Sequence, residues 1–241
     1  MKQILRILIV VFIFSYVIVT LVFANKHIDT TICNDFRIEL KDSSRMHLVS
    51  TSEAKRIIKT KGLNPVGKSF SNINIDAIER SLRDMKQIKN VSCYRLAGGV
   101  IQVDISQRTP ILRIISNNSN YFIDSEGNDM PVSYVQSVYL PVATGNIEKK
   151  YATTDLYNFA LFLQDNEFWN AQIEQIVVHD STNVELIPRI GNHTILVGDL
   201  NNLDNKFNKL MKLYEDGFSK IGWNKYRSID LRYKNQVVCS K

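Results

Sequence analysis

An uncharged apolar segment at the N-terminus is the feature that most limits how this chain can fold. Residues 7–24 read ILIVVFIFSYVIVTLVFA and contain no charged side chain. At a rise of about 1.5 Å per residue, a helix of about 20 residues spans the hydrocarbon core of a bilayer. The segment therefore predicts a transmembrane helix over residues 7–24, preceded by a short cytoplasmic tail of residues 1–6.

The residues that flank this segment predict its orientation. Lys2 and Arg6 precede it, and positive residues are retained on the cytoplasmic side of a membrane. The N-terminus is therefore expected in the cytoplasm, and everything after residue 24 outside it. A cleavable secretory signal is the alternative, because Val22 and Ala24 fit the small-residue positions of a cleavage site. The length of the run and its bulky aromatic residues favour an uncleaved anchor.

The composition of the whole chain is that of a folded protein. Hydrophobic residues make up 44% and charged residues 22%, which excludes a largely disordered or fibrous chain. The net charge of +6 comes from dispersed Lys and Arg, so no nucleic-acid-binding patch is predicted. Contact with anionic headgroups or cell-wall polymers stays open. Cys33, Cys93 and Cys239 allow at most one disulfide and lack the spacing of metal ligands.

Residues 33–108 have the pattern of a small α+β module. Alternating apolar and polar residues predict a strand from Cys33 to Leu40, with Phe36, Ile38 and Leu40 as its apolar positions. A capping-box signature that begins at Ser50 predicts a first helix, and Asn74 precedes a second one. Two apolar segments joined by a Gly-containing turn then predict a hairpin over 91–108. The predicted order of elements is β-α-α-β-β.

Residues 109–239 are predicted to form a mixed α/β domain built on an antiparallel sheet. The apolar segments between 173 and 197 have the layout of an antiparallel meander. Strands are expected at 111–115, 121–124, 138–140, 173–178, 183–188, 193–197 and 229–233.

Two helices are expected in this second domain. The first covers 153–164 and is capped by Thr153 or Thr154. The second covers 203–220 and has one broad apolar face. Its basic residues are expected to face solvent: Lys206, Lys209, Lys212 and Lys220.

The sequence contains little that indicates catalysis. It has no phosphate-binding loop and none of the common hydrolase motifs. The residue types of a catalytic triad occur together at His179, Asp180 and Ser181, but neighbours in sequence rarely converge as nucleophile, base and orienting group. The chain's four histidines lie in different segments: His27, His47, His179 and His193. We therefore predict no catalytic residue, no metal site and no cofactor.

The order of these segments resembles the FtsQ/DivIB family of bacterial division proteins, over roughly residues 1–239. The run IDAIERSLRDMKQIKNVSCYRL followed by GGVIQVDISQRTPILRI resembles the POTRA module of that family. Its strand-end motif matches Ser106–Pro110, with Gln107 where Glu is common. In the second domain, Phe122–Gly127 resembles a turn whose Asp and Gly serve backbone geometry. Ile229–Tyr233 resembles the terminal motif I/V-D-L/M-R-Y/F.

The resemblance implies a non-enzymatic divisome scaffold that links early and late division proteins. Such a protein is a single-pass protein of the bacterial inner membrane, mostly periplasmic and located at the division septum. In the family, the edge formed by the last strands of the β-domain receives a segment of the FtsB/FtsL pair by strand addition. By position, the implied partner-binding residues are Leu231, Arg232, Tyr233, Asn235, Gln236, Val237 and Val238.

Two readings of the terminal strand remain open. Tyr233 could be an aromatic anchor and Arg232 a charged contact for the partner, or Tyr233 could pack inside the sheet while Arg232 only solvates it. The POTRA sheet has a free edge of its own, which implies a second contact with other division proteins.

The alternative function is a POTRA-containing component of protein secretion or outer-membrane assembly, and an anchored cell-wall hydrolase is a further one. A secretion component requires a barrel of eight or more strands after the POTRA module, and the pattern after residue 109 does not resemble one. A hydrolase requires clustered acids or a nucleophile.

Overall fold

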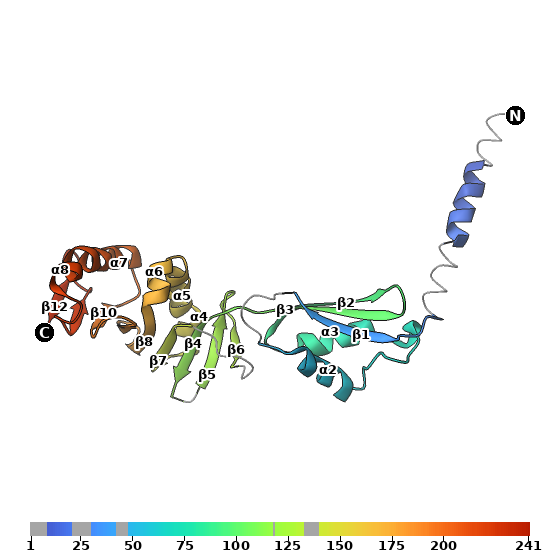
Figure 1. The fold of residues 1–241 in the computed structure, drawn as a ribbon, viewed down its shortest axis with the longest axis horizontal. Coiled ribbons are helices and arrows are strands. Elements are labelled where there is room, and N and C mark those ends of the chain that lie inside the picture. The colour runs from blue at the N-terminus through green and yellow to red at the C-terminus, as the bar shows by residue number, and fades with distance from the viewer. Residues whose placement is uncertain (1–8, 21–29, 42–47, 118, 133–139) are drawn as a thin grey trace. The chain divides into compact units, whose positions relative to one another are not determined.

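The computed structural model describes residues 9–20, 30–41, 48–117, 119–132 and 140–241. The chain divides into two compact units, Met1–Gln107 and Arg108–Lys241 (Figure 1).

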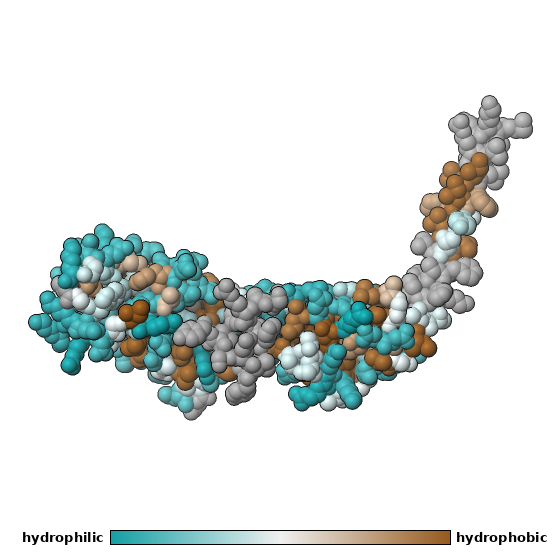
Figure 2. Space-filling model, in the orientation of Figure 1, coloured by the Kyte–Doolittle hydropathy of each residue, from teal (hydrophilic) through white to brown (hydrophobic). Residues whose placement is uncertain are grey.

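Residues 9–20 form a helix whose apolar side chains are exposed, brown in Figure 2. Within the described residues, no helix is both long enough and apolar enough to cross a membrane. The predicted span over 7–24 extends past both ends of this helix into residues that are not described, and the predicted tail of residues 1–6 lies outside the described residues.

The first unit confirms the predicted β-α-α-β-β order. Its three-stranded sheet has β3 at the centre, parallel to β1 and antiparallel to β2. The elements are β1 (Asp35–Leu40), α2 (Thr51–Thr60), the 3-10 turn η1 (Phe70–Asn72), α3 (Ile75–Arg83), β2 (Ile88–Leu96) and β3 (Val100–Gln107).

Both helices of this unit begin at the caps that the sequence predicts. The Ser50 hydroxyl accepts a hydrogen bond from the Glu53 amide at 3.1 Å, and the Asn74 side chain accepts one from the Ala77 amide at 2.9 Å. Each cap satisfies an amide that the helix itself cannot pair, which stabilises a helix by about 1 kcal/mol. The helices bury one apolar stripe each, formed by Ala54 and Ile58 in α2 and by Ile78 and Leu82 in α3.

The second unit is a nine-stranded sheet with helices. The strands run in the order β12-β11-β10-β9-β8-β7-β4-β5-β6. They are β4 (Pro110–Ser116), β5 (Ser119–Asp124), β6 (Asp129–Pro131), β7 (Val142–Gly145), β8 (Ile173–Asp180), β9 (Asn183–Pro188), β10 (Thr194–Gly198), β11 (Ser228–Asp230) and β12 (Val238–Ser240). The helices are α4 (Lys149–Thr153), α5 (Asp155–Gln164), α6 (Glu167–Gln172), α7 (Leu203–Lys212), the π-helical segment η2 (Leu213–Phe218) and α8 (Ser219–Ile221).

The predicted antiparallel character of this sheet is only partly correct. The meander of β8, β9 and β10 is antiparallel as predicted. However, β7 runs parallel to both β4 and β8, and β11 runs parallel to β10. Helices lie between β7 and β8 and between β10 and β11, and a helical crossover returns the chain to the same end of the sheet, which makes the next strand parallel.

Two local expectations for this unit are corrected, and a third is left untested. The helix predicted at 153–164 begins at Asp155. Thr154 occupies its N-cap position as predicted, but the Thr154 hydroxyl donates to the Lys150 carbonyl at 2.8 Å and makes no capping hydrogen bond. The predicted strand 138–140 falls largely outside the described residues, and β7 begins after it at Val142. The strand predicted at 229–233 ends at Asp230.

The core of the second unit is rich in aromatic side chains. Phe159 of α5, Trp169 of α6 and Phe207 of α7 are buried, and the Trp169 and Phe207 ring centroids are 5.0 Å apart in an edge-on arrangement. Such pairs add about 0.5–1.5 kcal/mol beyond the burial of their area. These contacts hold the helices together, and Figure 1 shows the helices on one side of the sheet. They fix α7, which lies near the end of the chain.

Candidate partner-binding site

The last strand, β12, lies at one edge of the nine-stranded sheet, and β6 lies at the other (Figure 1). Within the described part of the chain, β12 pairs with one strand, β11, in antiparallel register. The Val238 and Ser240 side chains are exposed, whereas Cys239 between them is partly buried against the core. An edge strand leaves a row of backbone N–H and C=O groups open on its free side, and another segment can pair with them.

Residues 231–237 form the loop that joins β11 to β12, and a lysine from α7 holds this loop. The Lys209 ammonium donates to the Tyr233 carbonyl at 2.6 Å, and it lies 3.4 Å from the carbonyls of Leu231 and Gln236. One ammonium group thus donates hydrogen bonds to three backbone carbonyls of the loop. The prediction that Lys209 faces solvent is therefore wrong.

Lys206, one turn earlier on α7, was also predicted to face solvent, and this prediction is wrong. Its side chain is only 13% exposed, and its ammonium contacts the Asp199 carboxylate at 2.7 Å and the Asp199 carbonyl at 2.8 Å. This hydrogen bond holds the pKa of Asp199 below its usual range. The two lysines attach α7 to Asp199, just before the helix, and to the loop before β12.

Asp230 and Arg232 form a bidentate ion pair where β11 ends. The Arg232 guanidinium donates to both carboxylate oxygens of Asp230, with its shortest contact at 2.6 Å. The Asp230 side chain is 11% exposed, and the hydrogen bonds from Arg232 lower its pKa. Gly198 makes room for this pair, because a Cβ atom at Gly198 would lie 2.8 Å from Cγ of Arg232.

The structure separates the seven residues that the resemblance implies for partner binding. Leu231 is buried in the core, so its side chain cannot reach a partner. Val237 is partly buried against the same core. The others are exposed: Arg232, Tyr233, Asn235, Gln236 and Val238. Of the seven, only Val238 belongs to β12, and the rest lie in the loop before it.

Tyr233 is the aromatic residue of this loop, and it is 48% exposed. The reading in which Tyr233 packs inside the sheet is therefore wrong. A pocket of about 380 Å³ lies beside it, between the loop and the N-terminal half of α7. Asn202, Asn205 and Lys206 contribute to its lining, so the surface next to Tyr233 is polar and can accept hydrogen-bonding groups.

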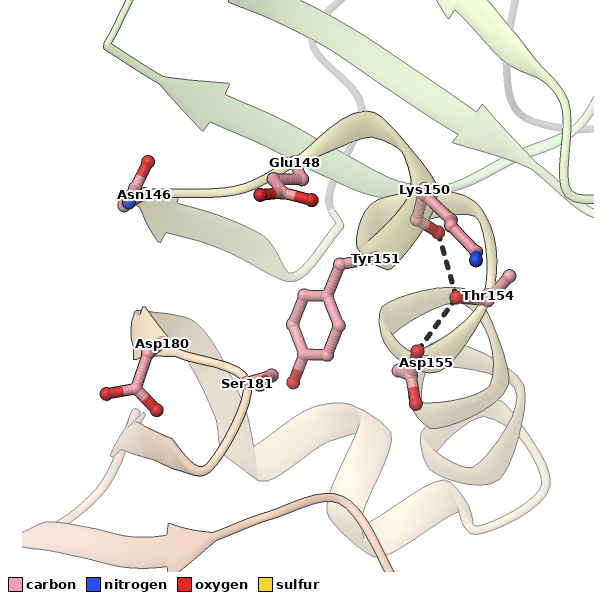
Figure 3. Close-up of a pocket in the computed structure, with 8 residues that line it drawn as sticks. All are labelled: Asn146, Glu148, Lys150, Tyr151, Thr154, Asp155, Asp180 and Ser181. Carbon is pink, nitrogen blue, oxygen red and sulfur yellow. Dashed lines mark hydrogen bonds between the residues drawn. The ribbon is translucent and has the colours of Figure 1, made fainter.

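A second pocket lies beside Asp180 and Ser181, two of the residue types of a catalytic triad. It has a volume of about 360 Å³, and Figure 3 shows the Tyr151 ring between the Asp180–Ser181 turn and Asp155. The Tyr151 hydroxyl is buried, and burial raises its pKa to about 12. A phenol with this pKa stays protonated at neutral pH and is a poor general base.

The neighbouring triad residue types do not assemble. The His179 imidazole contacts the Glu185 carboxylate at 3.2 Å, across from β8 to β9. Asp180 accepts hydrogen bonds from the amide and hydroxyl of Thr182, both at 2.7 Å, and so forms the turn after β8. These residues therefore have structural partners. Among the described residues, no group of His, Cys, Asp or Glu could hold a metal ion.

Comparison with known families agrees with the two units. Residues 109–240, more than half of the chain, match the family profile described as FtsQ/DivIB, C-terminal related. The chain belongs to the FtsQ/DivIB family. Residues 31–106 match a POTRA-like domain. No curated protein matches this FtsQ/DivIB sequence.

Two positions of this FtsQ/DivIB chain acquire a physical role from the structure. Gln107 is buried, and its side-chain oxygen accepts from the amides of Leu48 and Val49 at 2.8 and 2.9 Å. A neutral amide oxygen therefore acts as the hydrogen-bond acceptor at a position where the family motif commonly has a carboxylate. Asp124 accepts from the amides of Glu126 and Asn128, which is the backbone role that the turn motif predicts.

The motif over residues 229–233 located the end of the sheet, but no local pattern indicated the contacts that shape the loop before β12. Lys209 precedes the carbonyls that it binds by 22 to 27 residues, and no local pattern links such distant positions. The Gly198-Asp199 pair just before α7 was the available signal, because Gly198 accommodates Arg232 and Asp199 binds Lys206.

Proposed function

We propose that this chain is a non-enzymatic, membrane-anchored scaffold of the bacterial division machinery. It binds a segment of the FtsB/FtsL type along the free edge of β12. The edge position of β12, with Val238 and Ser240 exposed on it, is the observation that supports this proposal. Membership of the FtsQ/DivIB family supports the choice of partner.

The partner segment would pair with β12 by backbone hydrogen bonds and place alternate side chains against the surface beside it. Because β12 has three residues, the ladder offers only about two hydrogen bonds, each worth about 1 kcal/mol net. Side-chain contacts must therefore supply most of the affinity. The exposed Tyr233 ring is the best candidate, since aromatic residues dominate the energetics of interfaces.

The loop before β12 is suited to this role because it is held before the partner arrives. Lys209 ties its carbonyls to α7, and Asp230 holds Arg232. A loop that is already ordered loses less conformational entropy on binding than a free one. The Arg232 side chain is still about half exposed, so it can contact a partner without leaving Asp230.

The proposal includes a membrane anchor formed by residues 7–24, with the N-terminus in the cytoplasm and the two units in the periplasm at the septum. The exposed apolar side chains of the helix over residues 9–20 support it. The POTRA sheet ends in the edge strands β1 and β2, which leaves an edge for a further division protein.

In-cell photocrosslinking tests this proposal. A photoreactive amino acid is placed at Tyr233, Val238 or Ser240 in the full chain, with an exposed helix position, Asp216, as the matched control. We expect adducts with a small coiled-coil division protein from the first three positions and none from Asp216.

Two results would contradict the proposal at different levels. If the protein localised to the septum but gave no adduct from any terminal position, the β12 interface would be ruled out and the division role would stand. Absence of the protein from the septum would remove the division role itself and would favour a component of protein secretion or outer-membrane assembly.

A further inference from the structure

The β2–β3 turn of the POTRA module carries exposed apolar side chains at the end where the chain enters the module. Figure 1 shows this turn beside the entering chain. Ile32 bridges to Ser69, and the Asn34 amide donates to the Gly99 carbonyl at 2.7 Å. A Cβ atom at Gly99 would lie 2.5 Å from the Ile32 carbonyl oxygen. The entering chain and the turn are therefore packed together as one tip.

The surface of this tip combines apolar groups with a held cation. The Ile32 side chain is 55% exposed and the Leu96 side chain 40%. The Arg95 guanidinium lies 5.5 Å from the centroid of the Phe70 ring and donates to the Phe70 carbonyl at 2.9 Å. Arg95 is exposed, and the turn that follows it, Ala97-Gly98-Gly99, contains no charge.

The length of the chain places this tip near the bilayer, and this step rests on the proposed membrane anchor. Only six residues lie between the end of the predicted span, Ala24, and Thr31 at the tip, so seven Cα–Cα steps join the two. Even fully extended, seven such steps cover about 24 Å. The headgroup layer itself occupies about 5–8 Å of that distance. The tip is therefore confined to the neighbourhood of the lipid headgroups.

We propose that the tip formed by Ile32, Arg95, Leu96 and Ala97 binds the surface of an anionic membrane. The apolar side chains would enter the headgroup boundary while Arg95 contacts lipid phosphates. So few side chains would not hold a free protein on a bilayer, but the anchor keeps the tip at a high effective concentration beside it. The POTRA module would thus rest on the membrane by this end.

Fluorescence quenching in vesicles tests the contact. The full chain carries Cys239→Ser and Ala97→Cys, since Cys33 and Cys93 are buried, and it is labelled with an environment-sensitive fluorophore. It is reconstituted into phosphatidylethanolamine–phosphatidylglycerol vesicles that contain a nitroxide headgroup lipid. The matched control is Thr51→Cys, which lies at the other end of the module, because Gln107 of β3 binds the residues just before it.

We expect quenching at position 97 and little at position 51. Arg95→Gln should lower the equilibrium constant for tip contact by about fivefold, the equivalent of about 1 kcal/mol per basic residue near an anionic surface. Arg95→Lys, which keeps the charge, should retain the contact. Replacing phosphatidylglycerol with a zwitterionic lipid should weaken the contact as Arg95→Gln does.

Three outcomes would overturn the inference. Equal quenching at positions 97 and 51, in vesicles that float with the protein, would remove the lipid contact and leave the anchor in place. If the protein failed to float with the vesicles, both the lipid contact and the membrane anchor would be ruled out. If position 97 were unquenched in vesicles but crosslinked to a protein in cells, the tip would be a protein interface. None of these outcomes depends on β12, so the partner-binding proposal is tested separately.

Discussion

The Lys209 ammonium lies 2.6 Å from the carbonyl oxygen of Tyr233, 24 residues further along the chain. This hydrogen bond joins α7 to the loop that presents the exposed tyrosine. Since α7 is itself fixed by the buried Phe207 and Leu210, the position of the loop depends on the core. A change in Lys209 should therefore reach the proposed partner surface without touching a partner.

Lys209→Met should loosen the loop over residues 231–237. The substitution retains most of the side-chain volume but removes the donor to three carbonyls, and we expect a loss of about 1 kcal/mol in unfolding free energy. Hydrogen exchange of the loop should accelerate more than that of β8 and β9. Lys212→Met, at an exposed position of the same helix, is the control. Equal exchange rates in both variants would argue against this role of Lys209.

The Asp230–Arg232 pair predicts a pH dependence for the second unit. Because Arg232 lowers the folded-state pKa of Asp230, the unfolded chain binds more protons as the solution becomes acidic. The stabilisation is complete above the usual carboxyl value of 3.8 and is lost as the pH falls through the lower folded-state value. Asp230→Asn should reduce the slope of unfolding free energy against pH in this window, and an unchanged slope would show that the pair contributes nothing.

Gln107 predicts a stability effect in the POTRA module. Gln107→Leu leaves the buried amides of Leu48 and Val49 without their acceptor, and we expect a cost of about 2–3 kcal/mol. Gln107→Glu supplies an oxygen at the same place and should cost much less at neutral pH. Hydrogen exchange of the POTRA module, measured in the full chain, distinguishes the stabilities of these two variants. A mild Gln107→Leu would mean that another acceptor replaces the side chain.

His193 predicts a second pH effect at milder acidity. It is buried, and its Nε2 atom lies 2.8 Å from the Tyr214 hydroxyl. Burial lowers its pKa below the usual 6.5, so protonation favours the unfolded chain. Its stabilisation is complete above pH 6.5 and is lost as the pH falls through the folded-state value. His193→Gln should remove this part of the pH dependence of thermal unfolding, and persistence of the same slope would assign it to other groups.

Local signals in the sequence predicted much of the fold. Ser50 and Asn74 each mark the start of a helix, because a side chain that caps a helix acts within three residues. The turn at Asp124 was predictable for the same reason. The parallel pairing of β7 with β4 and β8 was not, since an apolar segment does not reveal which strand will lie beside it.

The candidate site was predictable only in outline. The motif over residues 229–233 located the end of the sheet, but a strand pattern and a loop pattern are alike over such a short segment. Whether Leu231 turns inward and Tyr233 outward depends on the contacts of Lys209 and Asp230. Those contacts depend on the completed fold, and so the buried Leu231 could not be separated from its exposed neighbours.

The most direct test of the account measures hydrogen exchange of β12 in the full chain, with and without an FtsB/FtsL-type pair. Strand addition would place those backbone amides of β12 that point away from β11 in new hydrogen bonds. We predict slower exchange in β12 and in the loop at Tyr233, with no change in β6 at the opposite edge of the sheet. Binding that leaves β12 unprotected, or that protects β6 or the POTRA edge instead, would contradict it.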